Sequence, residues 1–463
     1  MMNRDLRVNY LVASVTTIIA IIIFFYPTSQ SPDFKVLRGV ALGLFIIGIY
    51  ATQIVPELVA SLALFFIAII FSVSPTSIIF SGFQSTAFWL VFGGLIVGIA
   101  VEKTGLGIRL ADTILSRLGS TYATIVAGTI CVGVVLSFLL PSTMGRIMLL
   151  LPIILALCDR LGYNKGRKGR TGLIMAMAAG TWMPSSSILP ANVPNMVLTG
   201  VADNFFDIQL NYGSYFLLHF PMIGIAKSIL IFATVMLIFR DNPPDMVIQP
   251  SKVLPWNRDE KFLAVGLFLT LSLWSTDFLH GISPAWIALG AGLYCLMPII
   301  SLVDKNDFNA KLNTGSLIYV AAILGLGNIL IDTGAGDMVG TQLLSIFPLE
   351  FGNSFQNYIS IVGFGIILNM AATAPSVPAL LAPLASDLSS ASGLPLITVL
   401  MTMVIGYSTV IFPYQVPPII IAMQLGNISL RDATITTAII SLVTIAVLIP
   451  LNYFWWVILG YIS

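Results

Sequence analysis

Long apolar runs separated by short polar loops make up most of this chain. Most of the runs are long enough, or nearly so, to cross about 30 Å of hydrocarbon at 1.5 Å per residue in a helix. No cleavage pattern follows the first run, so we expect it to be retained as a span. With the interrupted runs counted, the pattern predicts about ten to twelve spans and re-entrant arms. The clearest runs cover residues 10–26, 36–54, 58–73, 215–239, 262–274, 284–302 and 435–459.

The composition agrees with burial in a membrane. Hydrophobic residues make up 57% of the chain and charged residues 9%, with a mean hydropathy of +0.97, whereas soluble domains carry about 25% charged residues. The sequence therefore predicts an all-α polytopic membrane protein in contact with the lipid bilayer. A net charge of +1 gives no reason to expect a nucleic-acid partner.

Basic residues gather in one polar loop, residues 159–170, and at the N-terminus, which carries Arg4 and Arg7. Cytoplasmic loops of membrane proteins carry an excess of Lys and Arg, so we expect both regions on the cytoplasmic side. The loop holds Arg160, Lys165, Arg167, Lys168 and Arg170.

Arg146 is a charged residue inside an apolar run, between Pro141 and Pro152 and next to Gly145. A charge at that depth costs roughly 2.5 to 3.5 kcal/mol on insertion scales, so it marks a functional site by default. Pro and Gly weaken the helix around it, and a broken helix at membrane depth is tolerated where it lines a binding cavity. The guanidinium is predicted to bind an oxyanion with its planar fork, or to supply a fixed charge in place of a cation. Pairing with a carboxylate or with helix carbonyls inside the bundle is the alternative.

An internal repeat divides the chain. The tetrapeptide TGLG at 104–107 recurs 229 residues later as TGAG at 333–336, and the Pro-x-x-x-Pro segment at 190–194 recurs at 413–417. Two halves with Gly-punctuated hairpins and Pro-broken helices are typical of secondary transporters, whose sites form at discontinuous helices near the midplane. Kinks in ordinary spans are the alternative. The predicted parts are an N-terminal segment with the first helix (1–35), repeat 1 (36–240), a polar linker (241–257) and repeat 2 (258–463).

Short motifs follow one another in a specific order: FGG at 92–94, the Ser142 segment that leads to LLP at 150–152, and VPNMV at 193–197. In this order and spacing the chain resembles the divalent anion/sodium symporters, which carry dicarboxylates, tricarboxylates or sulfate. The resemblance covers nearly the whole chain. It implies inverted repeats with re-entrant hairpins and broken helices, and a homodimer in a bacterial-type cytoplasmic (inner) membrane. It also implies an elevator mechanism, in which a transport domain slides along a fixed scaffold.

The chain departs from that family at its signature, a Ser-Asn-Thr tripeptide in each half that binds substrate carboxylates and helps to coordinate sodium. The corresponding tripeptides are STM at 142–144 and TAP at 373–375, so both asparagines are missing. The family's Pro-Pro-Asn loop is altered to VPN at 193–195, and to Pro417-Pro418 without an Asn. The substrate site predicted from the resemblance and the remaining polar groups consists of Ser142, Thr143, Arg146, Asn195, Thr373, Ala374, Ser376 and Gln415.

Helix breaks and hairpins are expected to shape this site. Inverted halves bring equivalent breaks to one site, so residues 142–144 and 373–375 should lie together, with hairpin tips near Gly93 and Ala322 pointing at them. The predicted break and hairpin residues are Pro141, Gly145, Gly93, Gly94, Ala322, Pro194, Pro375 and Pro417.

These features predict a secondary transporter of a small organic anion, di- or tricarboxylate-like, that works by sodium-independent exchange. The alternative is a sodium- or proton-coupled symporter for a dicarboxylate, sulfate or sulfonate, because carbonyls at helix breaks can hold a cation. An enzyme acting on lipid phosphate would show clustered Asp or His, and the two hairpins disfavour an anion channel. No cofactor or bound metal is expected, because the chain has two histidines, no metal-ligand motif and no Gly-Lys-[Ser/Thr] phosphate loop.

Overall fold

The computed structural model describes residues 2–26, 33–52, 54–116, 121–241, 255–336, 338, 349–371 and 374–462. Within these ranges the secondary structure is entirely helical. The predicted all-α polytopic fold is therefore confirmed. Five of the described helices are long and apolar enough to cross a membrane, namely Thr86–Thr104, Tyr122–Leu139, Tyr212–Phe239, Thr314–Thr333 and Leu430–Ile458.

The first half of the chain begins with apolar spans and ends with interrupted helices. Its elements are α1 (Met2–Phe24), α2 (Asp33–Thr52), α3 (Glu57–Ile70), α4 (Thr76–Ile79), η1 (Ser81–Gln84), α5 (Thr86–Thr104), α6 (Leu106–Ser116), α7 (Tyr122–Leu139), α8 (Thr143–Arg160), α9 (Lys168–Trp182), η2 (Pro184–Ser187), η3 (Leu189–Ala191), α10 (Val193–Phe206), α11 (Tyr212–His219), η4 (Phe220–Ala226) and α12 (Lys227–Phe239). The stretch η4 is π-helical and joins α11 to α12 in one long span.

The second half follows the same plan. Its elements are α13 (Arg258–Ser275), α14 (Asp277–His280), α15 (Pro284–Leu296), α16 (Lys305–Lys311), α17 (Thr314–Thr333), α19 (Ser354–Ala371), α20 (Ser376–Leu381), η5 (Ala382–Leu384), α21 (Ala385–Ser392), α22 (Leu396–Ser408), η6 (Pro413–Gln415), α23 (Pro417–Gly426), α24 (Leu430–Val443), η7 (Thr444–Leu448) and α25 (Ile449–Ile458). The stretch η7 is also π-helical and joins α24 to α25.

The order of elements is similar in the two halves. The spans α5 and α17 both end at a left-handed glycine, Gly105 with φ 77° and Gly334 with φ 75°, at the repeat interval seen in the sequence. Each half then has a hairpin (α7–α8, α19–α20), a broken helix (α9–α10, α22–α23) and a last span with a π-helical stretch. Residues 242–254 of the predicted linker lie outside the described ranges.

The hairpin of the first half lies at a different place from the one predicted. It is formed by α7 and α8, with its turn at residues 140–142. Gly93 and Gly94 lie inside the continuous helix α5, and Ala322 inside α17, so the prediction of hairpin tips there is wrong. The glycines allow close packing instead, because a Cβ at Gly93 would lie 2.4 Å from the backbone of α15, and one at Gly94 would lie 2.6 Å from Pro141 Cγ. Small residues let helices approach closely within a membrane.

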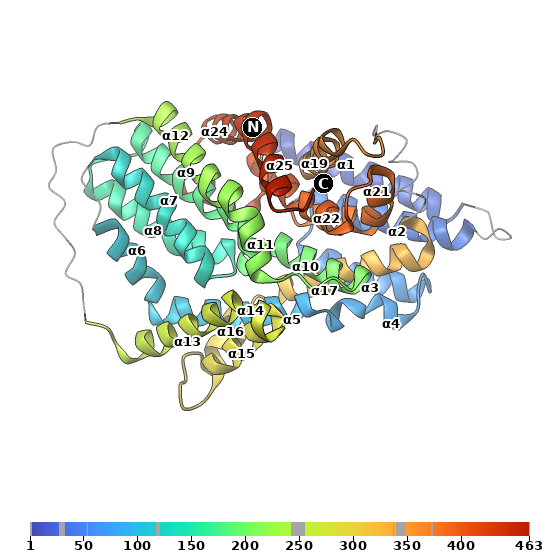
Figure 1. Ribbon diagram of the computed structural model, residues 1–463, viewed down its shortest axis with the longest axis horizontal. Coiled ribbons are helices and arrows are strands. Elements are labelled where there is room, and N and C mark those ends of the chain that lie inside the picture. Colours follow the sequence, from blue (N-terminus) through green and yellow to red (C-terminus); the bar gives the residue numbers. More distant parts are fainter. Residues whose placement is uncertain are drawn as a thin grey trace.

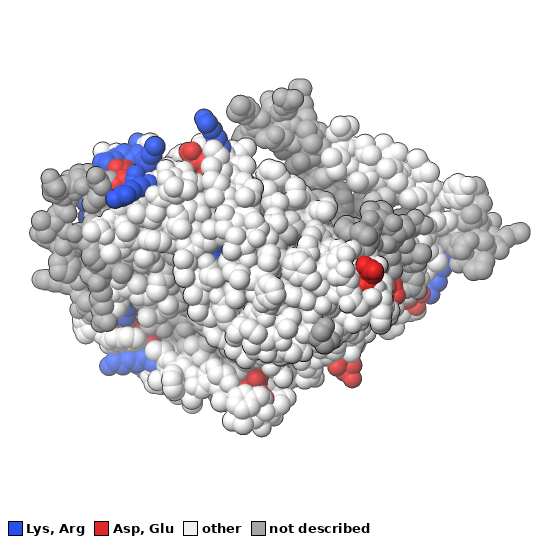
Figure 2. Space-filling model, turned by 45° about the horizontal axis from the view of Figure 1, so that its top comes forward, with Lys and Arg blue, Asp and Glu red and all other residues white. Residues whose placement is uncertain are grey.

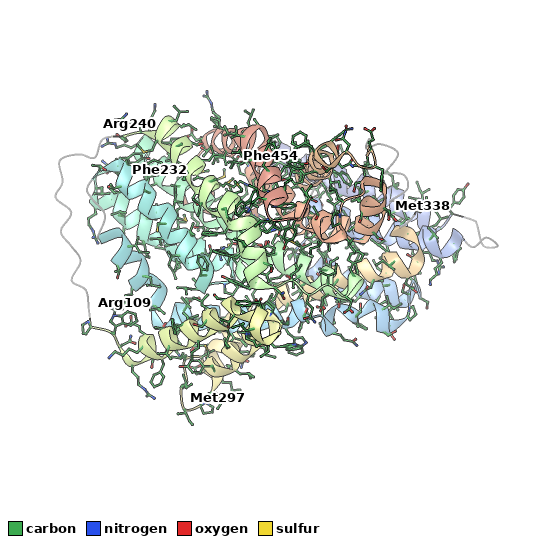
Figure 3. The ribbon with its side chains drawn as sticks, viewed as in Figure 1. Arg109, Phe232, Arg240, Met297, Met338 and Phe454 are labelled. Carbon is green, nitrogen blue, oxygen red and sulfur yellow. The ribbon has the colours of Figure 1, made fainter. Side chains whose placement is uncertain are left out.

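The helices form one elongated assembly (Figure 1). Helices α6 to α9 and α12 make one end, α1 to α4 and α17 make the other, and α10 and α11 lie between them. An ion pair fastens α6 to the beginning of α13, where Arg109 Nε donates to Glu260 Oε1 at 2.7 Å, and Arg109 is seen beside that helix in Figure 3. On the face shown in Figure 2, charged side chains lie mainly at the rims, as expected for helices whose sides contact lipid.

Candidate functional site

A cavity of about 200 Å³ lies where the interruptions of the two halves meet. Its lining includes the hairpin tips and residues within or on either side of the breaks, namely Ser142, Thr143, Met144, Trp182, Pro194, Ala374, Pro375 and Gln415. The same cavity is also lined by residues of α3, α5 and α17 and by the N-cap of α17, namely Glu57, Val91, Leu95, Asn313, Ser316 and Tyr319. The volume is below the roughly 300 to 1,000 Å³ of sites for drug-sized ligands, so the cavity suits a small molecule.

The predicted meeting of the two tripeptides is confirmed by this cavity. Residues 142–144 of the first hairpin lie in its wall together with Ala374 and Pro375 of the second. Thr373, also predicted for the site, lies outside the described residues. Pro141, Pro194 and Pro417 lie at the breaks in the same wall, and Gly145 lies one turn into α8.

Helix N-termini point to the kind of ligand that the cavity suits. Helix α8 begins after Ser142, whose Oγ accepts from Gly145 N at 3.2 Å, and α10 begins after Asn192, whose Oδ1 accepts from Asn195 N at 3.0 Å. The first turns of both helices line the cavity, and so does that of α23, whose first two residues are prolines without an N–H group. First-turn N–H groups have no partner within the helix, and the dipole makes this end positive. The arrangement favours a negatively charged ligand.

Arg146 lies behind the cavity wall and not in it. Its side chain is fully buried, and it is absent from the residues that line the cavity. Nη1 donates to the carbonyls of Leu140 and of Ala191, the latter at 2.8 Å, and Nη2 donates to Thr143 Oγ1 at 2.9 Å and to the carbonyl of Thr181 at 3.2 Å. The fork therefore ties together the hairpin tip, the end of α9 and the end of η3. The prediction that it grips a substrate oxyanion directly does not match this geometry.

Thr143 connects the buried guanidinium to the cavity. Its Oγ1 accepts from Arg146 Nη2, and the residue lines the cavity. A hydroxyl carries one donor hydrogen besides its acceptor lone pairs, so the Thr143 hydrogen can point away from Arg146 toward a bound anion. A hydroxyl that already accepts from a cation is polarised and donates more strongly.

Two buried amides at the breaks have different tasks. Asn195 Nδ2 donates to the carbonyls of Ser186 and Ile188 at 3.2 and 2.7 Å, and its Oδ1 accepts from Tyr407 OH at 2.6 Å. It braces the first break and does not line the cavity.

Gln415 does line the cavity. Its Oε1 accepts from Ile411 N and Phe412 N at 2.8 and 2.7 Å, which fixes the orientation of the amide. Its buried Nε2 has no partner among the described residues, and the same holds for Trp182 Nε1, in the same wall. Both are donors that a bound anion would satisfy. The predicted Ser376 is buried at the beginning of α20 and is not part of the wall.

Sequence reasoning missed two residues at the second break. Asn369 Nδ2 donates to the carbonyls of Gly406, Tyr407 and Thr409 at 3.4, 3.1 and 3.2 Å. Lys227 Nζ donates to Ser408 O at 3.0 Å and to Ser408 Oγ at 3.2 Å. Both side chains are buried. Lys227 lies inside an apolar run, so the rule that singled out Arg146 would also have found it.

Comparison with known proteins connects these features to a family. The sodium:sulfate symporter transmembrane region matches residues 7–462 of the chain. A membrane protein of Cupriavidus necator is 25% identical over 349 residues, which cover 73% of this chain and 67% of that protein. The L-tartrate/succinate antiporter of Escherichia coli is 22% identical over 393 residues, or 81% of this chain and 79% of that protein. In fold, the chain is similar to the YdaH transporter of Alcanivorax borkumensis, with a TM-score of 0.56 and 16% identity over 92% of this chain and 98% of that one.

Proposed function

The chain belongs to the sodium:sulfate symporter family, and from this premise we propose that it exchanges small organic anions, such as dicarboxylates, without sodium. It is an integral membrane transporter and not an enzyme. Its family, the L-tartrate/succinate antiporter and the YdaH protein are all transporters. The observation that carries the proposal is the set of acceptors around Arg146. Backbone carbonyls gathered at a helix break form a place for a cation, and here a guanidinium already occupies it.

Exchange of anions follows from this permanent charge. A guanidinium stays protonated in proteins, so its charge cannot leave with the substrate as a co-transported ion does. A second cation about 4 Å away would be repelled by about 4 kcal/mol at an effective dielectric of 20. The charge of Arg146, the polarised Thr143 hydroxyl and the helix N-termini together supply attraction for an anion in the empty and in the loaded site alike. The protein should then carry a second anion in the opposite direction when it returns across the membrane.

Counterflow tests this proposal. Purified protein in liposomes loaded with unlabelled succinate should take up labelled succinate, and a panel of dicarboxylates, tricarboxylates, sulfate and sulfonates inside the vesicles should rank the substrates. Replacing external sodium by choline should change uptake by less than about twofold, because an ion without differential affinity shifts no equilibrium. Steep, saturable activation by sodium at constant membrane potential would contradict the proposal.

Two groups of elements line the cavity and support an elevator movement. The hairpin tips and broken helices are one group, and α3, α5 and α17 are the other. Sliding of the first group along the second would carry a bound anion across the membrane without passing it through a pore. Crosslinks between cysteines placed at Met144 and Leu95 should trap one position and stop counterflow. A homodimer, which the resemblance implies, remains a prediction that light scattering would test.

Proton-coupled symport is the second candidate, and Glu57 is the observation that favours it. Glu57 lines the same cavity as the helix N-termini, where its negative charge opposes an anionic ligand until it takes up a proton. Glu57→Gln would then mimic the protonated form. Under the exchange proposal, Glu57→Gln should leave the ratio of uptake at pH 5.5 to uptake at pH 7.5 unchanged. Loss of an acid stimulation seen in the wild type would support the proton-coupled alternative.

A further inference from the structure

Lys227 is a charged residue in the interior of a span, and its surroundings are specific. It is the first residue of α12, directly after the π-helical stretch η4, and its relative exposure is 1%. Among the described residues, its ammonium has two partners, both on Ser408. Ser408 is the last residue of α22, at the second helix break. A charge at this depth is rare and marks a functional position.

The end of α22 is a cluster of carbonyls that need donors. The last carbonyls of a helix have no partner within it, and this end of the helix dipole is negative. Asn369 Nδ2 serves Gly406, Tyr407 and Thr409, and Lys227 Nζ serves Ser408 between them. Asn369 is neutral, so Lys227 supplies the only positive charge that the described residues bring to this cluster.

The fold of the last span does not by itself require a lysine. The second half has the same long span with a π-helical stretch, and Ile449 occupies the position directly after η7. Ile449 is also buried, with a relative exposure of 3%. The position after a π-helical stretch therefore tolerates an apolar side chain in this protein. What distinguishes Lys227 is its contact with Ser408, in the other half of the chain.

The neighbouring elements show how Lys227 reaches the break. Helix α12 packs against α9 and α24, and Figure 1 shows α11 and α12 between the group α7 to α9 and the C-terminal helices α24 and α25. On the same span, Tyr215 OH donates to Ser186 O at 2.7 Å and lies 3.4 Å from Tyr407 OH. The span thus contacts both broken helices, and its ammonium is placed at the second one.

We propose that Lys227 is the built-in cation of the second helix break, the counterpart of Arg146 at the first. The ammonium binds Ser408 where a free monovalent cation would otherwise be needed to hold the carbonyls of the break together. Both breaks are then kept in place by donors of the protein. This inference rests on the proposed sodium-independent function and extends it to the second half of the site.

Thermal melting of the purified full-length chain tests the inference without any substrate. Lys227→Gln keeps a hydrogen-bond donor of nearly the same length but removes the charge. We expect its melting temperature to be lower than that of the wild type in choline chloride, and to rise by at least about 3 °C in sodium or lithium chloride of equal ionic strength, because a bound ion stabilises the folded state. Wild-type protein and the exposed control Lys261→Gln should melt at the same temperature in all three salts.

The outcomes separate the charge of Lys227 from a merely structural role. A Lys227→Gln protein that melts at one temperature in all three salts would overturn the inference. Protein that can be purified folded in sodium but not in choline would support it. If no folded Lys227→Gln protein can be prepared, Lys227→Arg decides: we expect it to keep the wild-type melting temperature in choline, and an Arg variant as damaged as the Gln variant would refute the role of charge.

Counterflow distinguishes a failure of this inference from a failure of the proposed function. Succinate counterflow of Lys227→Gln liposomes should be at least about tenfold slower than wild type in choline and should recover in part with sodium. Wild-type protein that needs sodium for counterflow would defeat the proposed exchange, whereas the salt response of the Lys227→Gln melting temperature would stand unaffected.

Discussion

The two helix breaks solve the same physical problem with different donors. At the first break, one guanidinium from the adjoining hairpin serves three carbonyls and a hydroxyl, and the amide of Asn195 serves the carbonyls of Ser186 and Ile188. At the second, the amide of Asn369 and the ammonium of Lys227 divide the task. Irregular backbone at membrane depth must be satisfied by protein groups because lipid offers no hydrogen bonds. The comparison shows that both breaks need hydrogen-bond donors for their carbonyls, while the side chains that provide these donors differ between the two halves.

The breaks also differ where they face the cavity. The first hairpin tip brings the hydroxyls of Ser142 and Thr143, whereas the second brings Ala374 and Pro375 in the described part of its tip. The second half contributes a donor through Gln415 Nε2 instead. At the tips and breaks, the first half therefore brings hydroxyls to the cavity, with the charge of Arg146 behind them, and the second half brings the amide of Gln415. We expect substitutions in the first half to change anion binding more strongly.

Loss of Arg146 should have the largest effect. Arg146→Ala leaves the carbonyls of Leu140, Thr181 and Ala191 without their donor, at about 1–3 kcal/mol for each unsatisfied group, and it removes the charge. Succinate counterflow should fall at least about 100-fold, and Arg146→Lys should lower it about tenfold because a point charge cannot reproduce the planar fork. Arg160→Ala, at the exposed last residue of the same helix α8, is the matched control. Wild-type counterflow in a folded Arg146→Ala protein would show that the first break does not need its charge.

Asn369→Leu should rank second. The substitution keeps the volume of the side chain but removes the donor that serves Gly406, Tyr407 and Thr409, so the free energy of unfolding should drop by about 2 kcal/mol. We expect a lower melting temperature and counterflow slowed about tenfold, with Asn306→Leu on the exposed side of α16 as the control. If Asn369→Leu slows counterflow as much as Arg146→Ala does, transport depends more strongly on the donors at the second break than we expect.

Thr143→Val tests the link between Arg146 and the ligand. The branched shape of the side chain is kept. The hydroxyl that accepts a hydrogen bond from Arg146 and lines the cavity is lost. A hydrogen bond to a charged group contributes about 1.5–3 kcal/mol, so the KM for succinate should rise about tenfold or more. The melting temperature should also fall, because Arg146 Nη2 keeps only one of its two acceptors, the carbonyl of Thr181. An unchanged KM would mean that the anion does not contact this hydroxyl.

Ala374→Ser should have the smallest effect of the four. It adds a hydroxyl to the second tip, which lines the same cavity as the first-half hydroxyls. No guanidinium polarises a hydroxyl there, so we expect a change in KM of less than about threefold, the effect of a neutral hydrogen bond. A larger gain in affinity would show that the second tip lies as close to the anion as the first, and that the two halves share the ligand equally.

Several features followed from local sequence patterns. The apolar runs predicted helical spans, and the repeated TGLG and TGAG segments marked the left-handed glycines that end α5 and α17. Prolines marked the breaks, since Pro removes a donor and ends a helix. The hairpins were misplaced because Gly93 and Gly94 carry a signal that close packing produces equally well. A glycine in an apolar run does not reveal whether the backbone turns or a neighbouring helix approaches.

By itself, the sequence determined the all-helical fold, the similar order of elements in the two halves and the meeting of residues 142–144 with Ala374 and Pro375 at one cavity. Lipid leaves a spanning backbone almost no alternative to helix, so these features depend on local composition and on its repetition. The tertiary structure decided what the buried polar groups contact. It turned the fork of Arg146 toward carbonyls behind the cavity, and it brought Lys227 to Ser408 across 181 residues of chain. Such contacts depend on how whole helices pack, because the side chain and its acceptor lie on elements that only the folded state places together.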